Sequence, residues 1–206
     1  MTKVIIALAV LISSAIFGQN SFEEGMGKAL SLWSEGKNTE ASSLFERIAA
    51  AEKDQWLPNY YVAMVNTTTA FGTTEKNQVD ALLNKAQAAL EVELKKQPNH
   101  TELLVMQAMI YTAWINFDPM TNGVKLSGKV MEIYSKAQAI APENPRVLLS
   151  KTEFEMGAAR FYGNDIKPLC AQMKKAIELF ATFKPESPLH PNWGLDRAQK
   201  IVADCN

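Results

Sequence analysis

Residues 21–48 read SFEEGMGKALSLWSEGKNTEASSLFERI, and the pattern of these residues predicts the fold class of the chain. Phe22, Met26 and Trp33 recur at three- and four-residue steps, which is the period of a helix with one buried face. Gly36 predicts where this helix ends, because glycine readily adopts the left-handed conformation that closes a helix C-terminus. The first segment after residue 20 is therefore predicted to be an amphipathic helix.

A second helix is predicted to follow immediately. Asn38 or Thr39 can cap its N-terminus, and Ala41, Phe45 and Ile48 share its inner face. Only a few residues separate the two helices, so we expect them to pack as an antiparallel pair.

The rest of the chain repeats this pattern. Pro58, Pro98 and Pro142, with Pro185 or Pro188 after them, mark boundaries spaced by 40, 44 and 43 to 46 residues. Proline suits the first turn of a helix, where its missing N–H is not needed. Helical spacing predicts helices over 57–71, 77–96, 99–117, 122–141, 144–163, about 166–184 and 192–205. A period of about 40 residues with two helices per unit indicates a helical-repeat array.

One unit carries the spacing of a known family. Gly36-x4-Ala41-x3-Phe45, preceded by Ala29 and Leu32, resembles the tetratricopeptide repeat (TPR). Small residues in this pattern allow paired helices to approach closely. The resemblance implies an all-α fold, with antiparallel helix pairs stacked as a short TPR-like right-handed solenoid of about nine helices. It also implies a role in holding another protein or a peptide.

The N-terminus has the pattern of a secretory signal. One positive charge at Lys3 precedes an apolar run, Val4 to Phe17, of fourteen residues. Such a helix reaches about 21 Å, which is short of the roughly 30 Å of a bilayer core. We predict a signal peptide over 1–18 that is cleaved after Gly18, a TPR-like domain over 19–206, and a periplasmic or secreted protein with no membrane span after cleavage. An uncleaved anchor is the alternative.

The C-terminal region adds a second resemblance and a pair of thiols. The segment 188–194, Pro-x-x-Pro-Asn-Trp-Gly, is similar to the ends of small exported repeat proteins of Gram-negative bacteria. Cys170 and Cys205 lie on two helices that flank a short turn, at nearly equal distances from it, so their sulfurs are expected to lie level. Export favours a disulfide between them. Two buried free thiols are the alternative.

Composition argues against several classes of protein. The net charge is −1, with 21 basic and 22 acidic residues, so nucleic acid is a poor partner. Two cysteines and the separated His100 and His190 do not form a zinc motif, and we expect no metal and no cofactor. Both histidines lie beside prolines at helix starts, where we expect them to cap a helix or to be exposed.

A peptide groove is one candidate site. First helices of repeat units commonly line the concave face of such arrays. Six polar or aromatic residues on these helices are candidates for binding a peptide: Tyr61, Asn66, Thr69, Tyr111, Asn116 and Arg160. The alternative is that the tyrosines pack in the core and the threonines bond their own backbone.

Three functions follow from these observations. We expect a non-catalytic scaffold that binds a protein or peptide. A carrier with an inter-helix pocket for a small ligand is the alternative, because nine methionines and four tryptophans could line a soft pocket. An enzyme is a weaker hypothesis, because no catalytic motif is recognisable.

Overall fold

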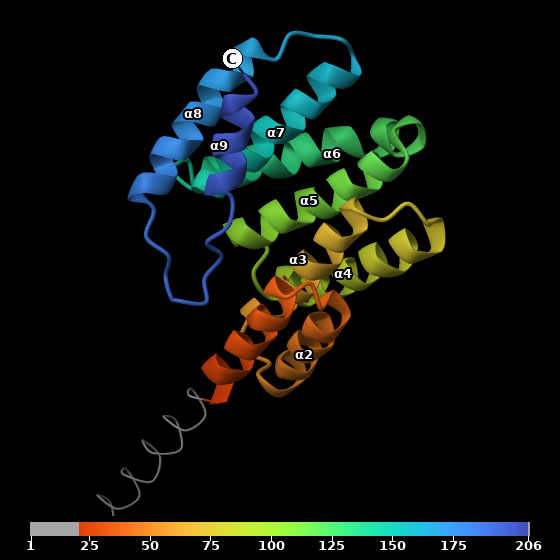
Figure 1. Ribbon diagram of the computed structural model, residues 1–206, viewed down its shortest axis with the longest axis vertical. Coiled ribbons are helices and arrows are strands. Elements are labelled where there is room, and N and C mark those ends of the chain that lie inside the picture. The colour runs from red at the N-terminus through yellow and green to blue at the C-terminus, as the bar shows by residue number, and fades with distance from the viewer. Residues whose placement is uncertain (1–20, 206) are drawn as a thin grey trace, which may run out of the picture.

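The described part of the chain is built from helices (Figure 1). A computed structural model describes residues 21–205, which contain no strand. After a helix over 21–34 come α2 (Asn38–Ala51), α3 (Leu57–Phe71), α4 (Lys76–Lys96), α5 (Thr101–Phe117), α6 (Pro119–Ile140), α7 (Pro145–Phe161), α8 (Lys167–Thr182) and α9 (Leu195–Ala203). The predicted all-α class is confirmed. The predicted signal peptide and its cleavage after Gly18 lie outside the described residues.

Neighbouring helices stack on one another. Each of α3, α5 and α7 packs against the helix that follows it, and α3 also contacts α5 while α5 contacts α7. The first helices of successive units thus form a continuous inner row, with the second helices outside it. This arrangement is the helical-repeat fold that the sequence period predicts.

Two turns show that the units are related. Gly36 and Gly163, at φ 77° and 71°, end the helix over 21–34 and α7. At each turn an amide bonds a carbonyl five residues earlier, from Lys37 to Leu32 at 2.9 Å and from Asn164 to Ala159 at 2.8 Å. Glycine accepts the positive φ that this closure requires.

The predicted boundaries are close to the observed ones, with one instructive difference. The range 57–71 coincides with α3. Helix α6 begins at Pro119 rather than at Asn122, because the Asp118 side chain accepts a hydrogen bond from the Thr121 N–H at 3.1 Å and caps the helix. Proline at the first helical position needs no N–H partner.

Helix α5 lies at the centre of the fold, as its apolar sequence predicts. Its buried residues include Leu103, Met106 and Ile110, which are completely inaccessible to solvent. Some buried residues of α5 belong to one of the hydrophobic clusters that hold the repeat units together, and others belong to a second cluster. No helix in the described part of the chain is both long and apolar enough to cross a membrane.

An extended segment connects the last two helices. Residues 183–194, called the strap here, leave α8, pass the N-terminal end of α5 and return to α9 (Figure 1). Gly194 ends the strap at φ 116°, where an added Cβ would lie 2.7 Å from side-chain atoms of both Leu149 and Phe180. Only glycine fits this entry into α9.

Candidate functional site

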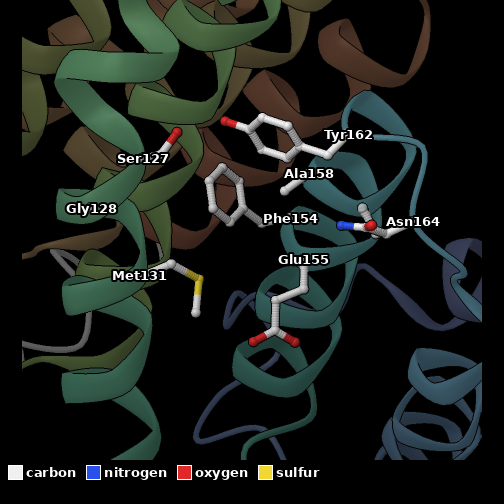
Figure 2. A pocket seen from close by; sticks show the side chains of 9 residues that line it. Ser127, Gly128, Met131, Phe154, Glu155, Ala158, Tyr162 and Asn164 are labelled. Carbon is white, nitrogen blue, oxygen red and sulfur yellow. The ribbon is translucent and has the colours of Figure 1, made fainter.

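An open cleft lies between parts of α6 and α7, which contact each other elsewhere along their length (Figure 2). Its volume is about 430 Å³, within the range of small-molecule sites. The lining residues come from α6, α7 and the turn after α7: Ser127, Gly128, Met131, Phe154, Glu155, Ala158, Ala159, Tyr162 and Asn164.

Helical spacing produces the two walls. Ser127, Gly128 and Met131 lie on one face of α6, and Phe154 and Ala158 lie one turn apart on α7. Gly128 and Ala158 have little or no side chain, so they leave the space between the two helices unfilled here. The rings of Phe154 and Tyr162 extend from the α7 side toward α6 (Figure 2).

The open end of the cleft is apolar and unpacked. Of the seven large apolar side chains exposed among the described residues, Tyr162 (75% exposed) lines the cleft, and three more lie next to it in sequence or by helical spacing: Met120 (76%), Val124 (89%) and Phe161 (57%). Met120 and Val124 continue the α6 wall by helical spacing, and the Phe161 ring meets the Tyr162 ring edge-on at 5.2 Å. We call these four the mouth residues. Apolar surface gathered in one place is typical of a binding site.

Polar groups in the cleft are few. Ser127, Asn164 and the Tyr162 hydroxyl can exchange hydrogen bonds with a ligand, and the Glu155 carboxylate lies 3.9 Å from the Lys151 ammonium. Lys151 also donates to the Gln138 side chain at 2.7 Å. The cleft is therefore an apolar slot with hydrogen-bonding groups at its edges, and among the described residues no cluster of His, Cys, Asp or Glu side chains could hold a bare metal ion.

The structure places the six candidate groove residues in different surroundings. Asn66 and Thr69 point toward α2. Asn66 Nδ2 donates to Ser42 Oγ at 2.8 Å, and Thr69 Oγ1 accepts from Asn38 Nδ2 at 2.9 Å. Tyr61 is buried, and its hydroxyl donates to the Leu189 carbonyl at 2.9 Å. Burial raises the pKa of Tyr61 to about 12.

The other three candidates are more accessible. Tyr111 is half-buried against the cluster between α5, α6 and α7, while Asn116 and Arg160 are exposed near the ends of α5 and α7. The six residues thus do not converge on one surface. Of the six, only Asn66 and Thr69 bond to the same neighbouring element, since their partners Ser42 and Asn38 both belong to α2.

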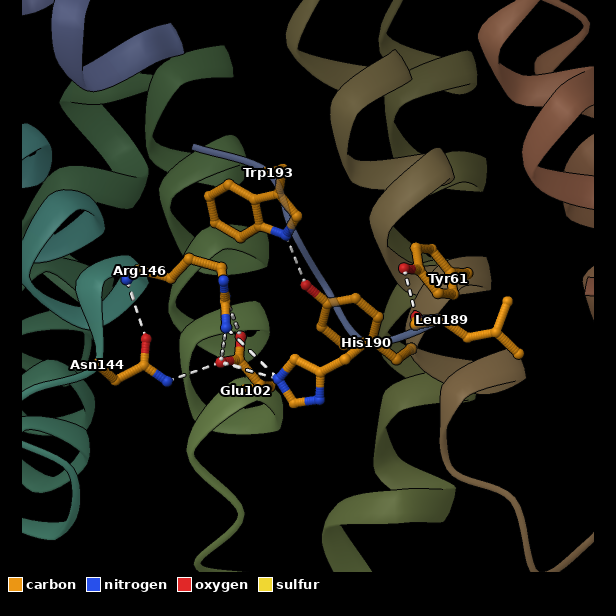
Figure 3. A network of polar contacts seen from close by, with 8 residues as sticks. Tyr61, Glu102, Asn144, Arg146, Leu189, His190 and Trp193 are labelled. Carbon is orange, nitrogen blue, oxygen red and sulfur yellow. Dashed lines mark hydrogen bonds and ion pairs between the residues drawn. The ribbon is translucent and has the colours of Figure 1, made fainter. Parts of the chain in front are cut away.

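A buried ion pair lies beneath the strap (Figure 3). Arg146 is fully buried; its Nε donates to Glu102 Oε2 at 2.8 Å and its Nη2 to Oε1 at 2.7 Å. Asn144 caps α7 by accepting from the Arg146 N–H at 2.9 Å, and it donates to Glu102 at 2.7 Å. Burial raises the pKa of Glu102, but bonds from Arg146, His190 and Asn144 outweigh it and lower that pKa to about 2.

The strap closes over this pair. His190 Nε2 lies 3.5 Å from Arg146 Nη2, and the Phe183 ring lies 4.5 Å from the guanidinium carbon. The Trp193 indole N–H donates to the Tyr60 hydroxyl at 2.8 Å. Our expectation that His190 caps a helix or is exposed is wrong, because the ring is buried between Arg146 and the strap's own Phe183. His100 makes no side-chain cap; its ring packs on Trp56 at 4.3 Å.

The two cysteines lie near the start of α8 and just after the end of α9, far along both helices from the strap that connects them. The structure joins Cys170 of α8 to Cys205, just beyond α9, by a disulfide across Cα atoms 6.1 Å apart. The bond closes a loop that contains the whole strap.

Sequence reasoning missed both the cleft and the network. Glu102 and Arg146 are charged residues in otherwise apolar helix segments and lie 44 positions apart. This separation is close to one repeat unit, and it was the available signal that the two charges meet. For the cleft, the available signal was the four-residue spacing of the apolar residues Met120 and Val124.

The described residues define an all-α helical-repeat protein with an apolar cleft between two of its helices. No family profile and no curated protein matches the sequence. Two solved structures share the fold. The HusA haemophore from Porphyromonas gingivalis matches with a TM-score of 0.77 over 89% of this chain and 91% of that chain, at 20% identity. A thermophilic TPR protein from Thermus thermophilus matches with a TM-score of 0.58 over 89% and 98%, at 12% identity.

Proposed function

We propose that this protein is an exported carrier of a flat, mostly apolar small molecule of the porphyrin class. The proposed site is the cleft between α6 and α7. The observation that carries the proposal is the exposed apolar surface there: Tyr162 lines an open cleft of about 430 Å³, and helical spacing extends the cleft's α6 wall to the exposed Met120 and Val124. Each Å² of apolar surface left in water costs about 25 cal/mol, which a ligand would recover.

The fold comparison supports this choice of ligand class. The structure with a TM-score of 0.77 is that of a haemophore, and it covers nearly the whole of both chains. Similar architecture does not fix function. The proposal therefore depends on the cleft, whose aromatic rings suit a planar conjugated ring.

A titration tests the carrier. Protoporphyrin IX or haemin added to the purified protein should show saturable one-to-one binding. The shift of the porphyrin absorption band measures this binding. Tyr162→Ser should weaken binding about tenfold, because an exposed ring that stacks on the ligand is removed without disturbing the core. Phe71→Ala, at an exposed aromatic residue that ends α3, is the matched control and should bind as the unmodified protein does.

A scaffold for a protein or peptide is the second candidate. The exposed Asn116 and Arg160, with the half-buried Tyr111, support it. A pull-down from the cell envelope should then retain a specific partner that Tyr111→Ala with Arg160→Glu releases. For the predicted concave groove, Tyr61 is already engaged by the chain's own strap at Leu189. This contact makes the inner surface at α3 the less favourable place for a peptide.

The remaining expectations stay proposals. The carrier would act in the periplasm or outside the cell after removal of residues 1–18, with the domain over 19–206 as the mature protein. Mass determination of the N-terminus of protein recovered from the envelope would test the cleavage after Gly18.

A further inference from the structure

Gly128 lies in the interior of α6, at a position where the fold does not require glycine. Gly128 is the tenth residue of a 22-residue helix, and it is not among the positive-φ glycines of the described chain. Apart from its chain neighbours and the backbone of its own helix, no atom lies within 4 Å of the position that its Cβ would take. Neither backbone conformation nor packing therefore explains the absence of a side chain.

Glycine is costly at such a position. It lowers helix stability relative to alanine, because the unfolded chain gains conformational freedom. One physical reason to keep glycine is that another molecule approaches the backbone closely. The position is suited to this, because Gly128 lines the cleft and faces the side of α7 that carries Phe154 and Tyr162 (Figure 2).

We infer that Gly128 is a contact point for the ligand, where one face of a flat ring lies directly on the α6 backbone while Phe154 and Tyr162 pack against the ring from the α7 side. The inference rests on the carrier function proposed above and adds where the planar ring of that ligand makes contact, which is the α6 backbone at Gly128. A rigid planar ring can lie flat on the backbone only where no side chain projects. A flexible acyl chain can bend around a side chain and does not need glycine at this position. Ser127 beside Gly128 keeps the adjacent wall small.

Adding a side chain at Gly128 should raise the stability of the ligand-free protein and weaken ligand binding. Gly128→Ala places a methyl group in open space, so the protein without ligand should become more stable, with a Tm about 2–4 °C higher. The same methyl group would lift the ring off the backbone and weaken its binding. A residue that serves only the fold would not separate the two effects in this way.

Gly123 supplies a matched control. It lies on the same helix, also has no atom within 4 Å of its missing Cβ, and does not line the cleft. Gly123→Ala should therefore raise the Tm by a similar amount and leave binding unchanged. A larger change, Gly128→Leu, should fill the slot and weaken binding at least tenfold.

The experiment measures Tm and the dissociation constant for metal-free protoporphyrin IX on the purified protein and the variants Gly128→Ala, Gly128→Leu and Gly123→Ala. We expect weaker binding for both Gly128 variants only, and tighter binding of protoporphyrin IX than of palmitate. Equal porphyrin binding by Gly128→Leu and the unmodified protein would overturn the inference while leaving the carrier proposal in place. Tighter binding of palmitate would overturn the planar-ring assignment. No porphyrin binding by the unmodified protein would end the proposed function itself.

Discussion

Arg146 of α7 and Glu102 of α5 form a fully buried ion pair, joined by two hydrogen bonds of 2.7 and 2.8 Å, that links two successive units of the repeat. The strap covers the pair with Phe183 and His190. The C-terminal segment therefore has a defined role in shielding charges that hold the inner row of helices together.

Acid should weaken the fold through Glu102. The pKa of Glu102 is lowered from 4.5 to about 2 in the folded state, so its stabilisation is fully present above about pH 4.5 and is lost as the pH falls through 2. The difference corresponds to about 3 kcal/mol. Urea unfolding at pH 2, 3, 4.5 and 7 should show this loss. The variant Glu102→Gln should have a flatter dependence in the same window, and an equally steep one would contradict the assignment.

Removing one partner of the pair should cost more than replacing both. Arg146→Met leaves a buried carboxylate without its partner and should lower the free energy of unfolding by about 3–5 kcal/mol. Combining it with Glu102→Leu should recover a large part of this loss, because the uncompensated charge is gone. Chemical unfolding of the single and double variants at pH 7 gives the comparison. A double variant less stable than Arg146→Met would show that other contacts of Glu102 dominate.

The strap should be anchored by the bond between Trp193 and Tyr60. The indole N–H and the phenol oxygen are 2.8 Å apart across 133 positions of sequence. Tyr60→Phe and Trp193→Phe should each destabilise the protein, and the double-mutant cycle should give a coupling of about 1 kcal/mol. Additive effects, with no coupling, would mean that the bond contributes nothing to holding the strap.

The disulfide should be present in protein recovered from outside the cytosol. Thiol labelling of the unreduced, denatured chain should modify neither Cys170 nor Cys205, and reduction should expose both. In the chain-entropy view, closing a loop of 35 residues stabilises by about 4 kcal/mol, so Cys170→Ser with Cys205→Ser should lower the unfolding free energy by up to that amount. Two labelled cysteines before reduction would exclude the bridge.

Much of the fold could be predicted because the positions of helices depend mainly on residues close together in the sequence. The period of Phe22, Met26 and Trp33, the stop at Gly36 and the prolines near 40-residue spacing use only short-range rules. The buried pair of Glu102 and Arg146 could not be found this way, because which charges meet depends on how units stack. The four-residue spacing of Met120 and Val124 marks one exposed apolar face of α6, but whether α7 fills the space beside Gly128 depends on how the two helices pack, which local spacing does not predict.

The mouth of the cleft offers the last prediction, because its apolar residues contribute little to the folded state. Met120→Ser with Val124→Ser should change the free energy of unfolding by less than about 0.5 kcal/mol, since both side chains are largely in water. The same change should weaken protoporphyrin IX binding several-fold, because the ligand loses apolar contacts on the α6 wall. Val92→Ser with Ile140→Ser, at two exposed apolar residues outside the cleft, is the matched control. A loss of binding in the control equal to that in the mouth variant would mean that porphyrin adheres to apolar surface in general, and the cleft would no longer be its site.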